Sequence, residues 1–295
     1  MALLLPLFGF LCGLGLSSIS FSKQLKQVLA SLLSRCFIPF VIVYNMVFYQ
    51  AGSLSLMIFS FVVAVFMYYF FRAVLKDKTR ALCMSYLNLA WLGFPFALAL
   101  FGEQISAPMV ALYVGGSIFG NIWAITALSK DKQPFHLMLK KVAFSPPVFA
   151  LIIAIILRLI GVQNLENHQL FDILNSIAKF GMTFSGMCVL GMWLRNTRIQ
   201  FADLFRSSKL FLMKVTVGIV ICSLTYFLIP IPHIEKYIGV MFLLFCLPPA
   251  ANIVALETHY LGTGVSAKYI ASGTIVSCMF VAVYGVFLHM ILPLL

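Results

Sequence analysis

The stretch Phe245–Val254, with the sequence FCLPPAANIV, decides how this chain folds. It places Pro248, Pro249 and Asn252 in the middle of an apolar run long enough to cross a membrane. Proline lacks a backbone N–H and clashes with the carbonyl four residues earlier, so a helix is interrupted there. The freed polar groups find no water in a bilayer, and such a break persists only where it lies inside protein or lines a cavity. The stretch therefore predicts a broken membrane helix beside a ligand path.

The composition on either side of this stretch is that of an integral membrane protein. Of 295 residues, 62% are hydrophobic and only 9% are charged, and the mean hydropathy is +1.05. The net charge of +12 comes from Lys and Arg clusters between apolar runs, where anionic lipid and membrane topology explain them, so a nucleic-acid partner is not expected. The seven cysteines lie in apolar segments without CxxC pairs, and neither disulfides nor a metal site is expected.

Ten apolar windows are long enough to serve as transmembrane spans. They cover residues 3–18, 28–48, 53–71, 81–101, 105–128, 142–160, 170–194, 210–229, 237–259 and 267–294. If they alternate across the membrane, fifteen Lys and Arg residues fall in loops on one side and two, Arg158 and Lys236, on the other. The positive-inside rule makes the first side cytoplasmic and places both termini outside. We therefore expect a multi-pass protein of the plasma (inner) membrane.

The ten windows divide into two groups of five with opposite orientation. We expect a first repeat at residues 1–128, a short cytoplasmic linker at 129–141 and an inverted second repeat at 142–295. Their motifs correspond weakly, as when Phe96–Ala99 is aligned with Val254–Glu257. In that register Asn88, Gly93 and Pro95 fall beside the prolines of the second break. Interrupted helices at matched positions of an inverted repeat mark the substrate site of many transporters.

The motifs themselves resemble a known family. The segment LPPAANIVALETHYLG, followed by ASGTIVS, is similar to the span 9 to span 10 signature of the auxin efflux carrier family. Asn88, Gly93, Pro95 and Gly102 resemble the span 4 motif of that family. The similarity extends over the whole chain in length and motif order and is sharpest near its C-terminal end. Two departures are Glu257, where the family usually has a small residue, and the short loop at residues 129–141.

This resemblance implies an all-α fold of the bile-acid-transporter type, with ten helices in a five-plus-five inverted repeat. Broken helices 4 and 9 would cross at the midplane of the membrane. Spans 1, 2, 6 and 7 would form a scaffold, through which such proteins commonly form homodimers, and spans 3–5 and 8–10 would form a moving transport unit. Family members carry organic anions such as malate, malonate or indole acetate.

The residues at the two breaks are the leading candidates for substrate binding. Asn88 and Asn252 either bond only the freed backbone groups or also touch the substrate, and we expect the second. Gly93, Pro95, Pro248 and Pro249 are expected to shape the breaks rather than to contact a ligand. Further candidates for the cavity wall are Asn45, Asn121 and Lys179. Lys179 either neutralises a carboxylate substrate or extends to the outer surface.

Glu257 lies inside the ninth span, and it is a candidate for Na⁺ or H⁺ coupling. The alternative is a hydrated rim residue paired with His259 or Lys268. No cofactor is expected, and no spacing of residues indicates catalysis or a metal site, so an enzyme is not expected. The sequence therefore predicts a secondary transporter of a small organic anion that works by elevator-type alternating access. Alternatives are a symporter coupled through Glu257 and a membrane sensor that binds ligand without moving it.

Overall fold

The computed structural model describes residues 4–48, 52–129, 135–165, 169–195 and 199–291. Within these ranges most of the chain is helical and no β-strand occurs, which confirms the predicted all-α class. The helices are α1 (Leu4–Leu16), α2 (Ser22–Leu32), η1 (Leu33–Phe37), α3 (Ile38–Val47), α4 (Ser53–Leu75), α5 (Lys78–Ser85), η2 (Leu89–Gly93), α6 (Phe94–Phe101), η3 (Glu103–Ile105), α7 (Ser106–Leu128), α8 (Phe135–Ala143), α9 (Pro146–Leu159), η4 (Val162–Leu165), α10 (Gln169–Arg195), α11 (Phe201–Leu228), α12 (Ile234–Cys246), α13 (Asn252–Leu261), α14 (Ser266–Val286) and η5 (Phe287–Ile291). Both chain ends and part of the expected linker, residues 130–134, lie outside the described ranges.

Six helical stretches of the described chain are long and apolar enough to cross a membrane, which supports a multi-pass membrane protein. They are Ser22–Val47, Ser53–Leu75, Glu103–Leu128, Gln169–Arg195, Phe201–Leu228 and Ser266–Met290. The apolar helices Leu4–Leu16, Leu89–Phe101 and Pro146–Leu159 are shorter. The 13 residues of α12 extend only about 20 Å at 1.5 Å per residue, against a hydrocarbon core of about 30 Å. Helix α12 alone is therefore too short to cross a hydrocarbon core.

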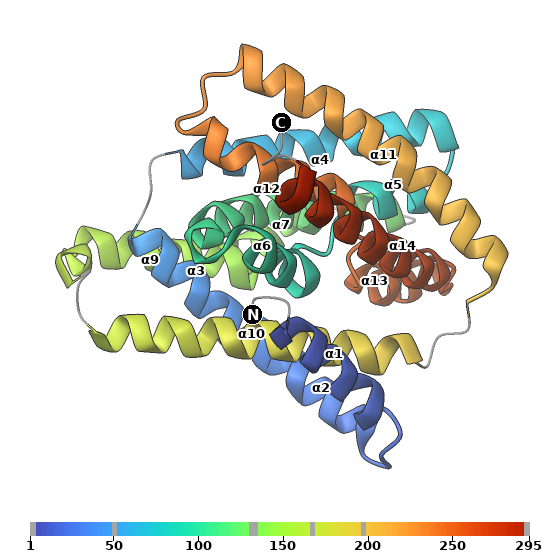
Figure 1. Ribbon diagram of the computed structural model, residues 1–295, viewed down its shortest axis with the longest axis horizontal. Coiled ribbons are helices and arrows are strands. Elements are labelled where there is room, and N and C mark those ends of the chain that lie inside the picture. The colour runs from blue at the N-terminus through green and yellow to red at the C-terminus, as the bar shows by residue number, and fades with distance from the viewer. Residues whose placement is uncertain (1–3, 49–51, 130–134, 166–168, 196–198, 292–295) are drawn as a thin grey trace.

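The helices pack in two pairs and in two sets of three. Helix α1 packs on α10, and α3 packs on α9. Helix α4 packs on α5 and α7, just as α11 packs on α12 and α14. Figure 1 shows α1, α2 and α10 along one edge, α4 and α11 along the opposite edge, and α6, α7 and α12 between them.

Small residues allow the closest of these contacts. A side chain at Gly13 of α1 would overlap the backbone at Cys188 of α10, and one at Gly191 would overlap the backbone at Phe10. Gly115 of α7 has the same relation to the backbone at Met57 of α4. Glycine lets membrane helices approach until their backbones touch. These contacts hold α1 to α10 and α4 to α7 as closely packed pairs.

Two π-helical turns precede prolines that lie within the described residues. Residues Leu33–Phe37 form η1 before Pro39, and residues Leu89–Gly93 form η2 before Pro95. Proline cannot donate to the carbonyl four residues earlier and its ring presses on that turn, so a widened turn relieves the clash. In both places the helix continues through the proline. The first break therefore lies at residues 86–88, a few residues before Gly93 and Pro95, and these two residues shape the widened turn that follows it.

Candidate functional site

The two helix breaks meet in the interior of the molecule. Between α5 and η2 the backbone is extended over residues 86–88, and between α12 and α13 it leaves the helix at Leu247. Leu87 and Pro249 form an antiparallel bridge. The Asn88 N–H donates to the Pro248 carbonyl oxygen at 2.9 Å, and the Ala250 N–H donates to the Tyr86 carbonyl oxygen at 2.8 Å. Each break thus satisfies backbone groups that the other leaves free.

The prolines explain where the second break falls. Helix α12 ends at Cys246, directly before the residue that precedes Pro248, because a residue before proline is driven out of the helical conformation. Leu247 accordingly has φ −80° and ψ 149°. The carbonyl of Cys246 accepts from the Ser277 hydroxyl at 2.5 Å. The helix is therefore broken at Pro248 and Pro249, and the carbonyls of Cys246 and Pro248 accept hydrogen bonds from within the protein.

A cavity of about 240 Å³ lies against the junction, and we call it the crossing cavity. Each break is followed by a helix, which we call its second half-helix: η2 with α6 after the first break, and α13 after the second. The cavity wall contains the start of both, namely Asn88 to Trp91 and Ala250 to Asn252. The other lining residues come from neighbouring helices and are Ser34, Ile38, Tyr86, Leu87, Tyr113, Gly116, Ser117, Asn121, Ser145, Pro146 and Pro147. Two helix N-termini, each equivalent to roughly half a positive charge, thus face one cavity.

Asn88 and Asn252 both line the crossing cavity but make different contacts. The Asn88 side-chain oxygen accepts from the Trp91 N–H at 3.2 Å and so caps η2. The Asn252 amide nitrogen donates to the Tyr86 hydroxyl at 2.9 Å, which links α13 to the opposite break. Asn88 is buried, with 6% exposure, whereas Asn252 is exposed. Asn252 therefore presents the more accessible amide to the cavity.

The remaining asparagines separate into one at the site and one away from it. Asn121 of α7 lines the crossing cavity, as expected. Asn45 of α3 does not belong to its wall, because its amide donates to the Val41 carbonyl of its own helix at 2.7 Å. Its amide therefore bonds its own helix rather than the site.

A second cavity of about 300 Å³ lies against α6, the helix that follows the first break, at Pro95 and Leu98. Lys179 lines it together with Glu103, and the Lys179 ammonium forms an ion pair with the Glu103 carboxylate at 2.5 Å. The side chain of Lys179 is 13% exposed and that of Glu103 is 73% exposed. Lys179 therefore belongs to this second cavity and not to the wall of the crossing cavity.

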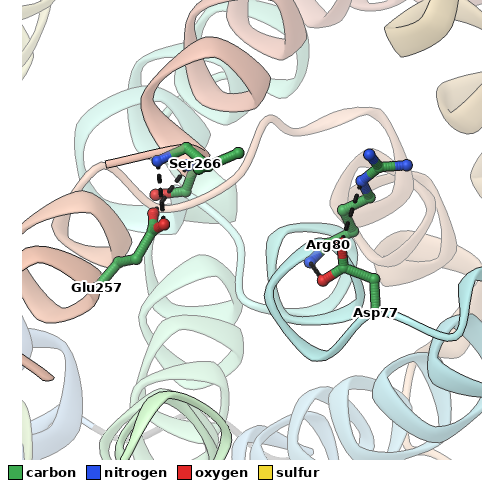
Figure 2. Close-up of polar contacts among 5 residues, drawn as sticks. Asp77, Arg80, Glu257 and Ser266 are labelled. Carbon is green, nitrogen blue, oxygen red and sulfur yellow. Dashed lines mark hydrogen bonds and ion pairs between the residues drawn. The ribbon is translucent and has the colours of Figure 1, made fainter. Parts of the chain in front are cut away.

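Glu257 is 1% exposed, and its carboxylate caps the start of α14 (Figure 2). One oxygen accepts from the Thr263 hydroxyl at 2.6 Å and the Val265 N–H at 3.0 Å, and the other accepts from the Ser266 N–H at 2.8 Å. Hydrogen-bond donors surround the carboxylate, whereas a hard cation such as Na⁺ is bound by oxygen ligands. This geometry favours an anchoring role for Glu257 over cation binding.

Asp77, also drawn in Figure 2, caps α5 in a similar way. Its carboxylate accepts from the Arg80 N–H at 3.0 Å and forms an ion pair with the Arg80 side chain at 3.2 Å. The Arg80 guanidinium in turn lies 5.0 Å from the centre of the Tyr269 ring in α14. Asp77 thus caps the start of α5, and Glu257 of α13 caps the start of α14.

Two residues of this region were missed by the sequence reasoning. Tyr86 forms part of the first break and holds Asn252, and no motif marks it. Lys214 of α11 is fully buried and donates to the Leu247 carbonyl at the second break. A lysine inside a predicted span is itself a signal of function, so Lys214 could have been found.

A comparison of the chain with models of known protein families finds no match. A comparison with curated proteins finds no similar sequence either.

Proposed function

We propose that this protein is a secondary transporter of a small organic anion and that the crossing cavity holds the substrate. The observation that carries the proposal is the hydrogen-bonded junction of two interrupted helices, with both second half-helices opening on one cavity. Broken helices inside a membrane persist where they line a cavity, and in transporters they form the substrate site.

The chemistry of the crossing cavity favours an anion. The positive ends of two helix dipoles face it, and the amides of Asn252 and Asn121 add hydrogen-bond donors. A volume of about 240 Å³ lies below the roughly 300–1,000 Å³ that is usual for pockets of drug-sized ligands. We therefore propose a compact carboxylate of the size of malonate or malate in preference to a larger auxin-like acid.

The finer architecture is part of the proposal. We propose ten spans arranged as two inverted repeats, with α5 to α6 as the fourth span and α12 to α13 as the ninth. The matched packing of α4 with α5 and α7, and of α11 with α12 and α14, supports this assignment. In this scheme α1, α2, α3, α9 and α10 form the scaffold, and the other spans form the transport unit, as in the auxin efflux carrier family.

The two cavities support alternating access. The crossing cavity is lined by Ser145 and Pro146, at the end of α9 next to the basic linker. The second cavity is lined by Leu5 and Glu103, at helix ends that the distribution of Lys and Arg assigns to the outer side. One half-helix, Leu89–Phe101, contributes to both walls. A shift of this half-helix against the scaffold would exchange access between the two sides.

The proposal is tested by reconstitution in liposomes. Candidate acids are first screened by their effect on thermal unfolding in detergent, and those that stabilise the protein are then offered to proteoliposomes. We expect saturable uptake of at least one small carboxylate. Binding without flux would instead support the membrane sensor. Uptake that requires Na⁺ or a proton gradient would support the symporter.

A further inference from the structure

Lys214 is a buried lysine beside the second helix break. Its side chain is 0% exposed, and its ammonium group donates to the carbonyl oxygen of Leu247, the residue that follows α12. The same nitrogen lies 4.5 Å from the centre of the Phe211 ring. Across the described residues, the ion pairs found do not include Lys214. The contacts found for the Lys214 amine are therefore a carbonyl oxygen and an aromatic face.

The position of Lys214 matches the charge that α12 leaves at its end. The C-terminus of a helix carries roughly half a negative charge on its free carbonyl groups. The carbonyls of Cys246 and Pro248 are paired with the Ser277 hydroxyl and the Asn88 N–H. The ammonium of Lys214 donates to the carbonyl oxygen of Leu247, which lies between these two residues in the chain. Lys214 thus adds the compensating charge to this helix end.

Hydrogen bonding alone does not require a lysine here. A neutral hydroxyl already serves the neighbouring carbonyl of Cys246, and burying a charge inside a protein is costly. Beside Lys214 lies a void of about 20 Å³, lined also by the hydroxyl residues Ser60 and Ser85, with room for a single water molecule. In transporters with broken helices, unwound carbonyls and half-helix C-termini of this kind coordinate the coupling cation.

We infer that Lys214 is a built-in cation that takes the place of a bound alkali ion at the end of α12, so that transport proceeds without Na⁺. This inference rests on the proposed function. Lys214 and Leu247 belong to spans of the same proposed transport unit, so the charge moves with the crossing. Lys214 does not line the crossing cavity and therefore acts as a positioning residue, through the break, rather than on the substrate.

The test compares thermal unfolding of the wild type, Lys214→Ser and Lys209→Met in NaCl and in choline chloride. Lys209 is an exposed lysine of the same helix and serves as the control. We expect the wild type and the control to have the same midpoint in both salts. Lys214→Ser opens a site lined by the Leu247 carbonyl and hydroxyls. Its midpoint should be lowered in choline and should rise with Na⁺ to a plateau.

A wild-type midpoint that depends on Na⁺, or a Lys214→Ser midpoint that does not, overturns the inference; the second result would leave Lys214 a structural donor only. If Lys214→Ser does not fold, Lys214→Met keeps the volume without the charge and should lower the midpoint in both salts. A Met variant as stable as the wild type also overturns the inference.

These readings need no substrate, so they are independent of the proposed function. If the wild type moves no acid in liposomes while the midpoints behave as expected, the proposed function fails and the built-in cation stands. If the wild type takes up malonate only in the presence of Na⁺, transport stands and the built-in cation fails.

Discussion

The backbone N–H of Asn88 donates to the carbonyl oxygen of Pro248 at 2.9 Å, which joins the breaks of two helices from opposite halves of the chain. The neighbouring pair, Ala250 N–H to the Tyr86 carbonyl, completes a short antiparallel junction. A buried backbone group without a partner would be costly, so neither break is stable without the other.

Asn88 combines capping with a place in the cavity wall, and two substitutions separate these roles. Serine at this position keeps a capping oxygen, whereas alanine removes it at a cost of about 0.5–2 kcal/mol of stability. We expect Asn88→Ala to lower both the thermal midpoint and uptake. Asn88→Ser should keep the midpoint and still lower uptake on the order of tenfold, because the amide is lost. Wild-type uptake by the Ser variant would show that Asn88 only caps η2.

A substitution at Gly120 tests whether the position of the Tyr86 ring, which holds Asn252, matters for transport. A methyl group at Gly120 would overlap the ring of Tyr86, whose hydroxyl accepts from Asn252. We expect Gly120→Ala to displace this ring and to lower the uptake rate on the order of tenfold. Gly264→Ala is the matched control, because a methyl group there meets no atom within 4 Å. Equal uptake by the two variants would separate Tyr86 from transport.

Lys179 and Glu103 connect the proposed scaffold to the proposed transport unit across the second cavity. Reversing either charge places like charges together, so we expect Lys179→Glu and Glu103→Lys each to change the maximal uptake rate several-fold. The apparent affinity for substrate should stay unchanged, because Lys179 does not line the crossing cavity. The double exchange should restore the rate. A double variant whose maximal uptake rate is lower than that of both single variants would exclude this ion pair during transport.

Glu257→Gln tests anchoring against ion coupling. Glutamine keeps one acceptor oxygen but presents an NH₂ group to donors of the α14 start, so the thermal midpoint should fall. Loss of hydrogen bonds to a charged group costs about 1.5–3 kcal/mol. Glu235→Gln, at an exposed position of α12, should leave the midpoint unchanged. Retained stability with an altered dependence of uptake on Na⁺ or pH would restore the coupling role.

The second break could be predicted from sequence because Pro248 and Pro249 exclude a continuous helix. The first could be placed only approximately. Its helix leaves the regular path at residues 86–88, where no residue type forces a break, and Pro95 merely widens the following turn. The partner of the Asn88 backbone lies in the other half of the chain, so only the tertiary fold determines the position of this break.

Tertiary structure also decides which of the candidate asparagines line the crossing cavity and which do not. Asn88, Asn121 and Asn252 come together at the crossing cavity because they lie near the breaks or on the helix packed against them. Asn45 bonds its own helix instead. Whether a polar side chain in a membrane helix faces its own backbone or a cavity depends on helix rotation, and composition does not determine that rotation.

The central claim is tested most directly by malonate and malate uptake into proteoliposomes that contain wild type, Asn252→Ala or Asn45→Ala. Asn45 is the same residue type, lies outside the crossing cavity and bonds its own helix. We predict saturable uptake by wild type and Asn45→Ala, and uptake at the level of empty liposomes by Asn252→Ala, with all three proteins folded. Wild-type uptake by Asn252→Ala would contradict a substrate site at the crossing of the two broken helices.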